Sequence, residues 1–144
     1  MRRLLGMAIA AACLVAALVP LRAAVPRAGD IVVTATYKGK GAVDDKHHIL
    51  LFLFTEPHPT AQSEPLAMES VAKNGGTATF KNVTQESVFV IGVYDEKSNY
   101  DGRSGPPPEG TPVSTYGKGG KPVPVTPGPS TKIAFVFDDT KRFK

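Results

Sequence analysis

Two segments of the chain alternate apolar and polar residues with a period of two, the period of a β-strand that has one buried face. They are residues 30–37, DIVVTATY, and residues 131–137, TKIAFVF. The side chains that we expect to face the core are Ile31, Val33, Ala35 and Tyr37 in the first segment and Ile133, Phe135 and Phe137 in the second. We therefore predict a strand at each of these places.

Two further segments are apolar at odd and even positions alike. Residues 47–54, HHILLFLF, are apolar on both parities from Ile49 onward, and residues 86–94, ESVFVIGVY, repeat this pattern. Short runs of this kind, rich in phenylalanine and valine, are typical of central strands that are covered on both faces rather than of a buried helix. Within the second run, Gly92 predicts a bulge or a close approach of another backbone.

Residues 66–80 carry the pattern of a β-hairpin. The segments LAMESV at 66–71 and TATF at 77–80 flank KNGG at 73–76. An Asn-Gly pair between two strand-like runs is a strong signal for a tight hairpin turn, because both residues tolerate a positive φ. We therefore predict that these two strands pair with each other.

Residues 105–129 differ from the rest of the chain in composition, since they hold eight of its 13 prolines. Proline lacks the N–H group that an interior strand needs. We expect this Pro/Gly-rich excursion either to wrap over the domain as an extended, polyproline-like chain or to hang from it as a flexible loop. The charged residues 138–144 that follow the last predicted strand are expected to be frayed.

The segments together predict an all-β protein. No stretch after residue 24 has helical periodicity, and no internal repeat is present in the 144 residues. Short strands separated by turn residues indicate an antiparallel two-sheet sandwich of about seven strands, of immunoglobulin or transthyretin type. Residues 25–144 are predicted to form this sandwich as a single domain, which is long enough to build one hydrophobic core.

Residues 1–24 have the pattern of a secretory signal peptide. Arg2 and Arg3 precede an apolar run at residues 4–19, and small residues follow it. The run is shorter than the ~20 residues that cross a bilayer, so we expect no stable membrane span in the mature chain. The predicted location is secreted or periplasmic. A retained membrane anchor and lipidation of Cys13 are the alternatives.

Charge and cysteine content narrow the function further. The chain has 17 Lys and Arg against 13 Asp and Glu, and without Arg2, Arg3 and Arg22 the basic residues number 14, which leaves a net charge of about +1. Lysines never form a block with interleaved aromatics, so no nucleic-acid partner is expected. The one cysteine, Cys13, lies in the leader, so the mature chain is expected to have no disulfide.

One loop carries candidate ligands for a hard cation. Calcium takes about six to eight oxygen ligands, often from Asp and Asn side chains around a glycine turn. An EF-hand loop would have an acidic residue where this chain has Lys97 and a Glu where it has Pro107. The other interpretation is a solvated turn, because Asn, Asp and Gly tolerate left-handed backbone. The loop residues are Asp95, Ser98, Asn99, Asp101 and Gly102, and the predicted metal ligands are Asp95, Asn99 and Asp101.

Three histidines, His47, His48 and His58, are weaker candidates for a zinc or copper site. No cysteine or second spaced histidine pair accompanies them. His47 and His48 are adjacent at the start of a predicted strand, so they point to opposite faces. We interpret them as ordinary histidines.

Catalytic motifs are missing from the sequence. It has no GxSxG, no mature cysteine nucleophile and no phosphate-binding glycine loop. Its carboxylates, such as Glu56, Glu64, Glu69 and Asp95, are scattered over loops and strands, and the sequence singles out no catalytic pair among them. We therefore predict that the protein is not an enzyme and has no catalytic residues and no cofactor, apart from the calcium that the loop residues could bind.

Residues 75–117, GGTATFKNVTQESVFVIGVYDEKSNYDGRSGPPPEGTPVSTYG, resemble the half-pattern of bacterial secreted β-sandwich modules. The pattern is a glycine, an aromatic at a strand end, a short turn, an apolar strand ending in Tyr-Asp, an Asn/Asp/Gly loop and a Gly-Pro segment. Carboxypeptidase-regulatory-like domains and related uncharacterised exported proteins look like this. The resemblance implies a transthyretin-like, seven-stranded sandwich without a catalytic role of its own.

The function expected from the sequence is that of an exported, non-enzymatic module. We expect it to bind or support another macromolecule, an unknown protein or glycan, at the cell envelope. One alternative is a calcium-stabilised or carbohydrate-binding module that uses the 95–102 loop. Another is a transthyretin-like homo-oligomer with a small-ligand channel at its interface.

Overall fold

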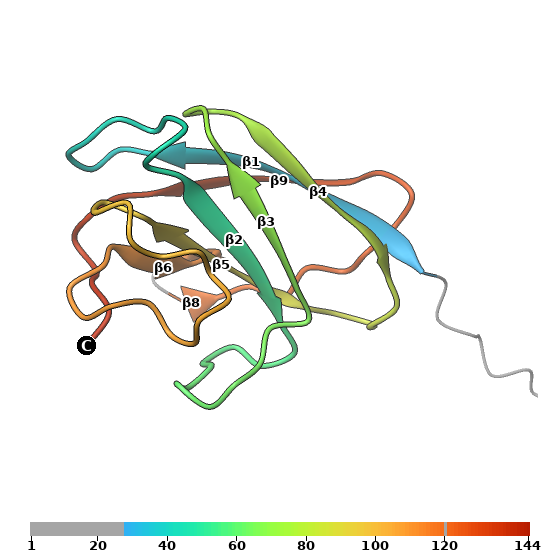
Figure 1. Ribbon diagram of the computed structural model, residues 1–144. Coiled ribbons are helices and arrows are strands. Elements are labelled where there is room, and N and C mark those ends of the chain that lie inside the picture. Colours follow the sequence, from blue (N-terminus) through green and yellow to red (C-terminus); the bar gives the residue numbers. More distant parts are fainter. Residues whose placement is uncertain (1–27, 120) are drawn as a thin grey trace, which may run out of the picture.

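The computed structural model describes residues 28–119 and 121–144 (Figure 1). The predicted signal peptide, residues 1–24 with Cys13, lies outside the described residues. Every element of the described chain is a strand, which confirms the all-β prediction. The described residues therefore contain no helix that is long and apolar enough to cross a membrane. The strands are β1 (Gly29–Tyr37), β2 (Ile49–Phe54), β3 (Ala67–Val71), β4 (Thr77–Val83), β5 (Phe89–Tyr94), β6 (Val113–Thr115), β7 (Gly117–Lys118), β8 (Lys121–Pro122) and β9 (Thr131–Phe137).

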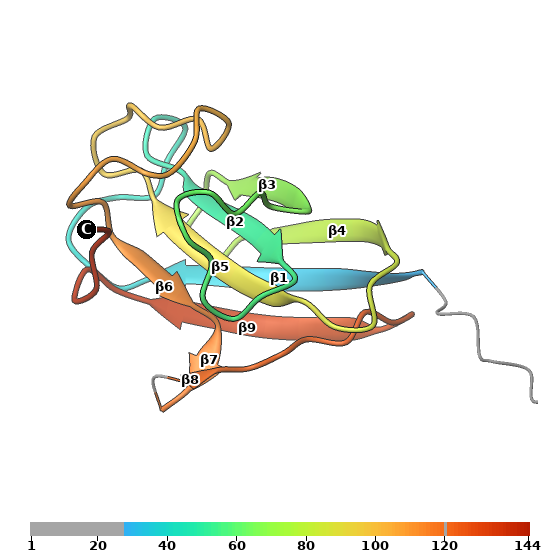
Figure 2. The same ribbon diagram turned by 90° about the horizontal axis from the view of Figure 1, so that it is seen from below.

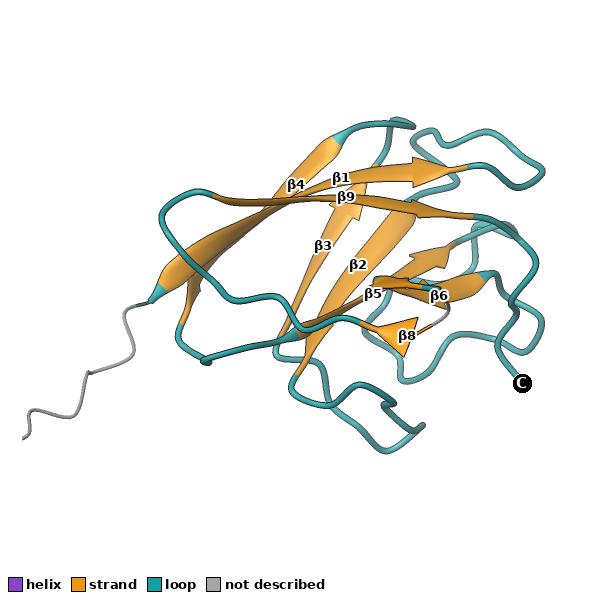
Figure 3. Cartoon of the chain, turned by 180° about the vertical axis from the view of Figure 1, so that it is seen from behind, coloured by secondary structure: helices purple, strands orange, loops and turns teal. Residues whose placement is uncertain are grey.

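Two main sheets lie face to face. One has three strands in the order β4-β1-β9, and the other has four in the order β3-β2-β5-β6. Figure 1 looks onto the four-stranded sheet, and Figure 3 shows the three-stranded sheet from the other side. The short β7–β8 hairpin projects from the edge of the molecule in Figure 2. As the sequence predicted, β2 and β5 are the central strands of their sheet.

The prediction of a purely antiparallel sandwich is wrong for one pair of strands. β1 pairs with β9 in parallel, from Ile31 opposite Thr131 to Tyr37 opposite Phe137. A parallel pair requires a long crossover between its strands, and here the whole four-stranded sheet lies between them in the chain. Alternation of apolar residues is the same in both directions, so the sequence pattern carries no sign of this.

The predicted hairpin at 66–80 is also wrong. β3 pairs with β2, while β4 pairs with β1, so the two strands belong to different sheets. The Asn-Gly turn carries the chain from one sheet to the other and pairs with β1. The Tyr37 N–H donates to Asn74 Oδ1 and Asn74 Nδ2 donates to the Tyr37 carbonyl, both at 2.8 Å. Gly75 N–H donates to the Ala35 carbonyl at 2.9 Å.

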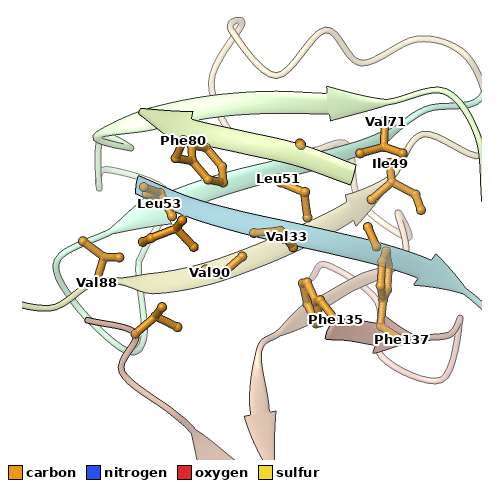
Figure 4. Close-up of a cluster of buried hydrophobic side chains, with 14 of the residues drawn as sticks. Val33, Ile49, Leu51, Leu53, Val71, Phe80, Val88, Val90, Phe135 and Phe137 are labelled. Carbon is orange, nitrogen blue, oxygen red and sulfur yellow. The ribbon is translucent and has the colours of Figure 1, made fainter. Parts of the chain in front are cut away.

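The hydrophobic core lies between the two sheets (Figure 4). The inward positions predicted for β1 are all buried, and so are Phe135 and Phe137 of β9, while Ile133 is half-buried against the core. Tyr37 and Tyr94 stack across the two sheets with ring centroids 4.0 Å apart. The side-chain directions predicted from the period of two are therefore confirmed.

The structural reason for Gly92 differs from the predicted bulge or close backbone approach. β5 pairs with β2 in unbroken register, with Gly92 opposite Leu51, so there is no bulge at this position. A Cβ on Gly92 would lie 2.6 Å from Cε1 of Phe135. The glycine makes room for an aromatic side chain of β9 rather than for another backbone.

The Pro/Gly-rich segment 105–129 is part of the fold and does not hang free. It supplies β6 at the edge of the four-stranded sheet, and Val125 is buried where it bridges to Val88. Residues 138–144 are not frayed either. Phe143 N–H donates to the Thr111 carbonyl at 2.9 Å, and Arg142 forms an antiparallel bridge with Pro112.

Candidate functional site

The outer face of the four-stranded sheet is apolar. In β2 and β5 the residues that alternate with the core positions point away from the three-stranded sheet. Antiparallel sheets usually present polar residues on such a face. Here it carries a second apolar cluster beside Ile91, and the cluster consists of Leu50, Phe52 and Val93 with Phe54, Met68, Tyr100 and Val113 packed against them.

Two loops cover this face only in part and leave an open groove of about 950 Å³ between them. One wall is the loop of residues 55–66, which joins β2 to β3, and the other is the loop of residues 95–112, which joins β5 to β6. In Figure 1 both loops flank the face of the sheet. Pockets of up to about 1,000 Å³ are typical of ligand sites. The floor of the groove is formed by Phe52, Phe54, Met68, Ile91, Val93 and Val113.

Three polar side chains of the 55–66 wall, those of Thr60, Gln62 and Ser63, form hydrogen bonds within the loop. The Thr60 N–H donates to Ser63 Oγ at 2.9 Å, and the Thr60 hydroxyl donates to Gln62 Oε1 at 3.2 Å. The Ser63 N–H in turn donates to the Thr60 carbonyl at 3.0 Å. This wall therefore offers a ligand few polar groups besides the exposed side chains of His58 and Glu64.

The 95–112 wall is fixed to the sheet by Tyr100 and Gly102. The Tyr100 ring lies 6.3 Å from the ring of Phe52, and its hydroxyl donates to the Gly105 carbonyl at 2.9 Å. Burial, and then the charge of Asp101, raise the pKa of the Tyr100 phenol. Gly102 has a φ of 75°, and a Cβ there would collide with Met68. The glycine allows the loop backbone to lie directly on the groove floor.

The structure separates the three predicted calcium ligands into two turns. Asp95 is buried, and its Oδ1 accepts a hydrogen bond from the Asn99 N–H at 3.0 Å. Asp101 Oδ1 instead accepts from the N–H groups of Arg103 and Ser104, at 2.8 and 3.1 Å, and from the Ser104 hydroxyl. These bonds, the Arg103 N–H first, lower the pKa of Asp101.

No group of three or more His, Cys, Asp or Glu side chains that could hold a metal ion occurs in residues 28–119 and 121–144. Asparagine is not among these residue types, so the calcium site of Asp95, Asn99 and Asp101 stays a prediction. Asp101 forms an Asx turn with the N–H two residues on, and Asp95 closes a wider turn with the N–H four residues on, so both carboxylates shape the groove wall.

The three histidines lie in two separate places. His47 Nδ1 contacts Asp44 Oδ1 at 2.9 Å, and His48 Nε2 contacts the Asp45 carbonyl at 2.8 Å, both just before β2. His58 lies on the 55–66 wall of the groove. The structure therefore does not bring the three imidazoles together.

The rim of the groove has one charge of each sign on opposite walls. Glu64 stands on the 55–66 wall and Arg103 on the 95–112 wall, and both side chains are exposed. Neither forms a salt bridge with another residue in the described part of the chain. Both charges face solvent beside an apolar floor.

The sequence pattern does not reveal this groove. The only trace of the groove in the sequence is that the residues of β2 and β5 that point away from the core are apolar as well. This pattern predicted that both faces of the strands are covered, but not how completely. Which loops cover the face depends on contacts between distant segments, such as Gly102 with Met68. Comparison with known proteins adds no assignment, because no family model, no curated protein and no solved structure matches the chain significantly.

Proposed function

We propose that this protein is an exported, non-enzymatic binding module and that its groove takes an extended, apolar segment of a partner protein. The observation that carries the proposal is the apolar outer face of the four-stranded sheet, which its own loops cover only in part. Burying apolar surface is worth roughly 25 cal/mol per Å². A partner that covers the floor would gain this free energy.

The chemistry of the walls favours a peptide over a glycan. A sugar presents many hydroxyl groups and needs many free hydrogen-bonding partners. The Thr60, Gln62 and Ser63 side chains are already bonded within their own loop. The floor is aliphatic and aromatic, which suits apolar side chains that point down from an extended chain.

The rim charges indicate the composition of the partner segment. Glu64 attracts a basic residue at one side of the groove, and Arg103 attracts an acidic residue at the other. Apolar residues lie between these two charges and contact the floor. Exposed charges of this kind set orientation and association rate more than affinity.

The exported and non-enzymatic parts of the proposal rest on sequence patterns. The signal-peptide pattern at residues 1–24 supports export to the cell envelope, and the lack of catalytic motifs supports a binding role. The finer assignment to carboxypeptidase-regulatory-like modules is supported by the motif at residues 75–117.

The test is selection from a phage-displayed library of random peptides against the mature chain, followed by synthesis of the selected peptides. We expect apolar peptides flanked by one basic and one acidic residue. Phe54→Ala should weaken their binding about tenfold, because it removes an aromatic side chain from the floor. Arg103→Glu should weaken peptides with an acidic flank and favour peptides in which that flank is basic.

The matched control is Lys132→Glu, an exposed charge reversal on β9 of the other sheet, which should change nothing. Failure to select any peptide, or selection of peptides whose binding is insensitive to Phe54→Ala and Arg103→Glu, would overturn the proposal. Selective binding of oligosaccharides instead would favour the glycan alternative.

A further inference from the structure

Residues 141–143, which we call the strap, extend the four-stranded sheet beyond β6. Three backbone hydrogen bonds join the strap to the chain before and in β6. The Val113 N–H donates to the Lys141 carbonyl at 3.0 Å, and the Phe143 N–H donates to the Thr111 carbonyl at 2.9 Å. The Gly110 N–H donates to the Phe143 carbonyl at 2.8 Å. Figures 1 and 2 both show the marked end of the chain beside the loop that precedes β6.

One guanidinium group holds the strap from its exposed side. Arg142 Nη1 donates to Glu96 Oε2 at 2.9 Å and to the Gly110 carbonyl at 2.7 Å. Its Nη2 lies 3.6 Å from Asp139 Oδ2. The hydrogen bond and charge of Glu96, with the charge of Asp139, raise the pKa of Arg142. The ion pairs are partly exposed, so salt screens them.

The next residue, Phe143, belongs to the groove lining and lies next to the 95–112 wall. It is half-buried and lines the same groove as Tyr100 and Pro107. Lys141 and Arg142 are exposed, so Phe143 is the strap side chain that contributes to the groove. Arg142 itself is not among the groove-lining residues.

We propose that the strap completes the binding groove, with Phe143 as a contact residue for the apolar ligand and Arg142 as its positioning residue. The inference rests on the groove being the binding site of the proposed function. It adds that the affinity of the groove depends on ionic strength, because the contacts of Arg142 with Glu96 and Asp139 hold Phe143 in place. High salt loosens the strap and weakens binding.

The test uses N-phenyl-1-naphthylamine, a neutral apolar dye whose fluorescence rises in apolar surroundings. Phe54→Ala should weaken dye binding and so locate the dye in the groove. Phe143→Ala should weaken it about three- to tenfold, the range expected for the loss of one aromatic contact. Arg142→Ala should have a smaller effect in the same direction, and Arg142→Lys should recover part of the loss.

The double variant Arg142→Ala/Phe143→Ala should bind the dye like Phe143→Ala alone, because Arg142 acts through Phe143. Raising the salt concentration from about 0.05 to about 1 M should weaken dye binding more for the wild-type chain than for Arg142→Ala, because salt screens the contacts that the variant lacks. Lys144→Ala is the control for removal of a neighbouring positive charge. Thermal unfolding of each variant separates loss of the groove from loss of the fold.

Two results would overturn the inference. One is dye binding that weakens with Phe54→Ala but is unchanged by Phe143→Ala. The other is an effect of Arg142→Ala that adds fully to that of Phe143→Ala. Since the dye is independent of the peptide partner, a failed peptide selection would refute the proposed function without deciding on the strap.

Discussion

Tyr37 and Tyr94 stack on each other in the core, yet their hydroxyl groups have opposite surroundings. The Tyr94 hydroxyl donates to the Ala42 carbonyl at 2.7 Å. The Tyr37 hydroxyl is buried and has no hydrogen-bond partner among the described residues. A buried hydroxyl without a partner keeps its full desolvation cost. The same chemical group therefore stabilises the fold at one position and destabilises it at the other.

Replacing the two phenols by phenylalanine should have effects of opposite sign. Tyr37→Phe removes an unsatisfied polar group and should raise the free energy of unfolding by about 1 kcal/mol. Tyr94→Phe removes a hydrogen bond and should lower it by about 1 kcal/mol. Urea denaturation of both variants at neutral pH measures the difference. Equal loss of stability in both would show that the Tyr37 hydroxyl is satisfied in solution.

Ionisation of the Tyr37 phenol should lower the stability of the fold at alkaline pH. Burial, followed by the charges of Asp139 and Glu96, raises the pKa of Tyr37 from 10.0 to about 12. Because the folded pKa exceeds the unfolded one, ionisation of this phenol leaves the free energy of unfolding unchanged below pH 10.0 and lowers it as the pH rises from 10.0 toward about 12. Tyr37→Phe should therefore lose less stability over this range. Some loss should remain, since burial also raises the pKa of Tyr94.

For single residues, the sequence predicted correctly which side of a strand each side chain faces, but not which distant residues it contacts. The inward positions of β1 and β9 follow from the alternation within each strand, and the structure confirms them. The partner of a side chain is a different matter, because it lies far away in the sequence. Gly92 was expected at a bulge or beside another backbone and instead faces the ring of Phe135.

The element that decides the topology is the turn between β3 and β4. The sequence pattern around Asn74 and Gly75 predicted a hairpin, yet the Asn74 side chain forms two hydrogen bonds with the backbone of Tyr37. These bonds satisfy the end of β1 and hold the turn against the three-stranded sheet. The chain therefore crosses between the sheets at a place where local turn chemistry favours a hairpin.

Asn74→Ala should test the importance of this clamp. It removes two hydrogen bonds of 2.8 Å, each worth about 1 kcal/mol, so the free energy of unfolding should fall by about 2 kcal/mol. Lys73→Ala, at an exposed position beside it, is the control and should cost less than about 0.5 kcal/mol. Denaturation curves for the two variants give the comparison. Equal stability of both would mean that the clamp does not hold the turn.

For the molecule as a whole, the calcium site of Asp95, Asn99 and Asp101 stays a prediction with a simple test. Calcium at about 100 times its dissociation constant would stabilise the fold by about 2.7 kcal/mol. The mature chain would then melt at a higher temperature with millimolar calcium than with chelator, and Asp101→Asn would reduce the shift. An unchanged melting temperature would contradict the site and leave the turn hydrogen bonds of Asp95 and Asp101 as the role of these carboxylates.

The sequence by itself determined the six longer strands, β1 to β5 and β9, with the sides of β1 and β9 that face the core and the two strands that are central; the short strands β6, β7 and β8 in the Pro/Gly-rich segment were not predicted. These properties are local, because successive side chains of a strand point to opposite faces. The tertiary structure alone decided that β1 and β9 are parallel and that β3 and β4 lie in different sheets. It also decided that residues 141–143 pair with the edge of the four-stranded sheet. It also decided the groove, because covering a sheet face depends on where distant loops land, and no period along the chain records that.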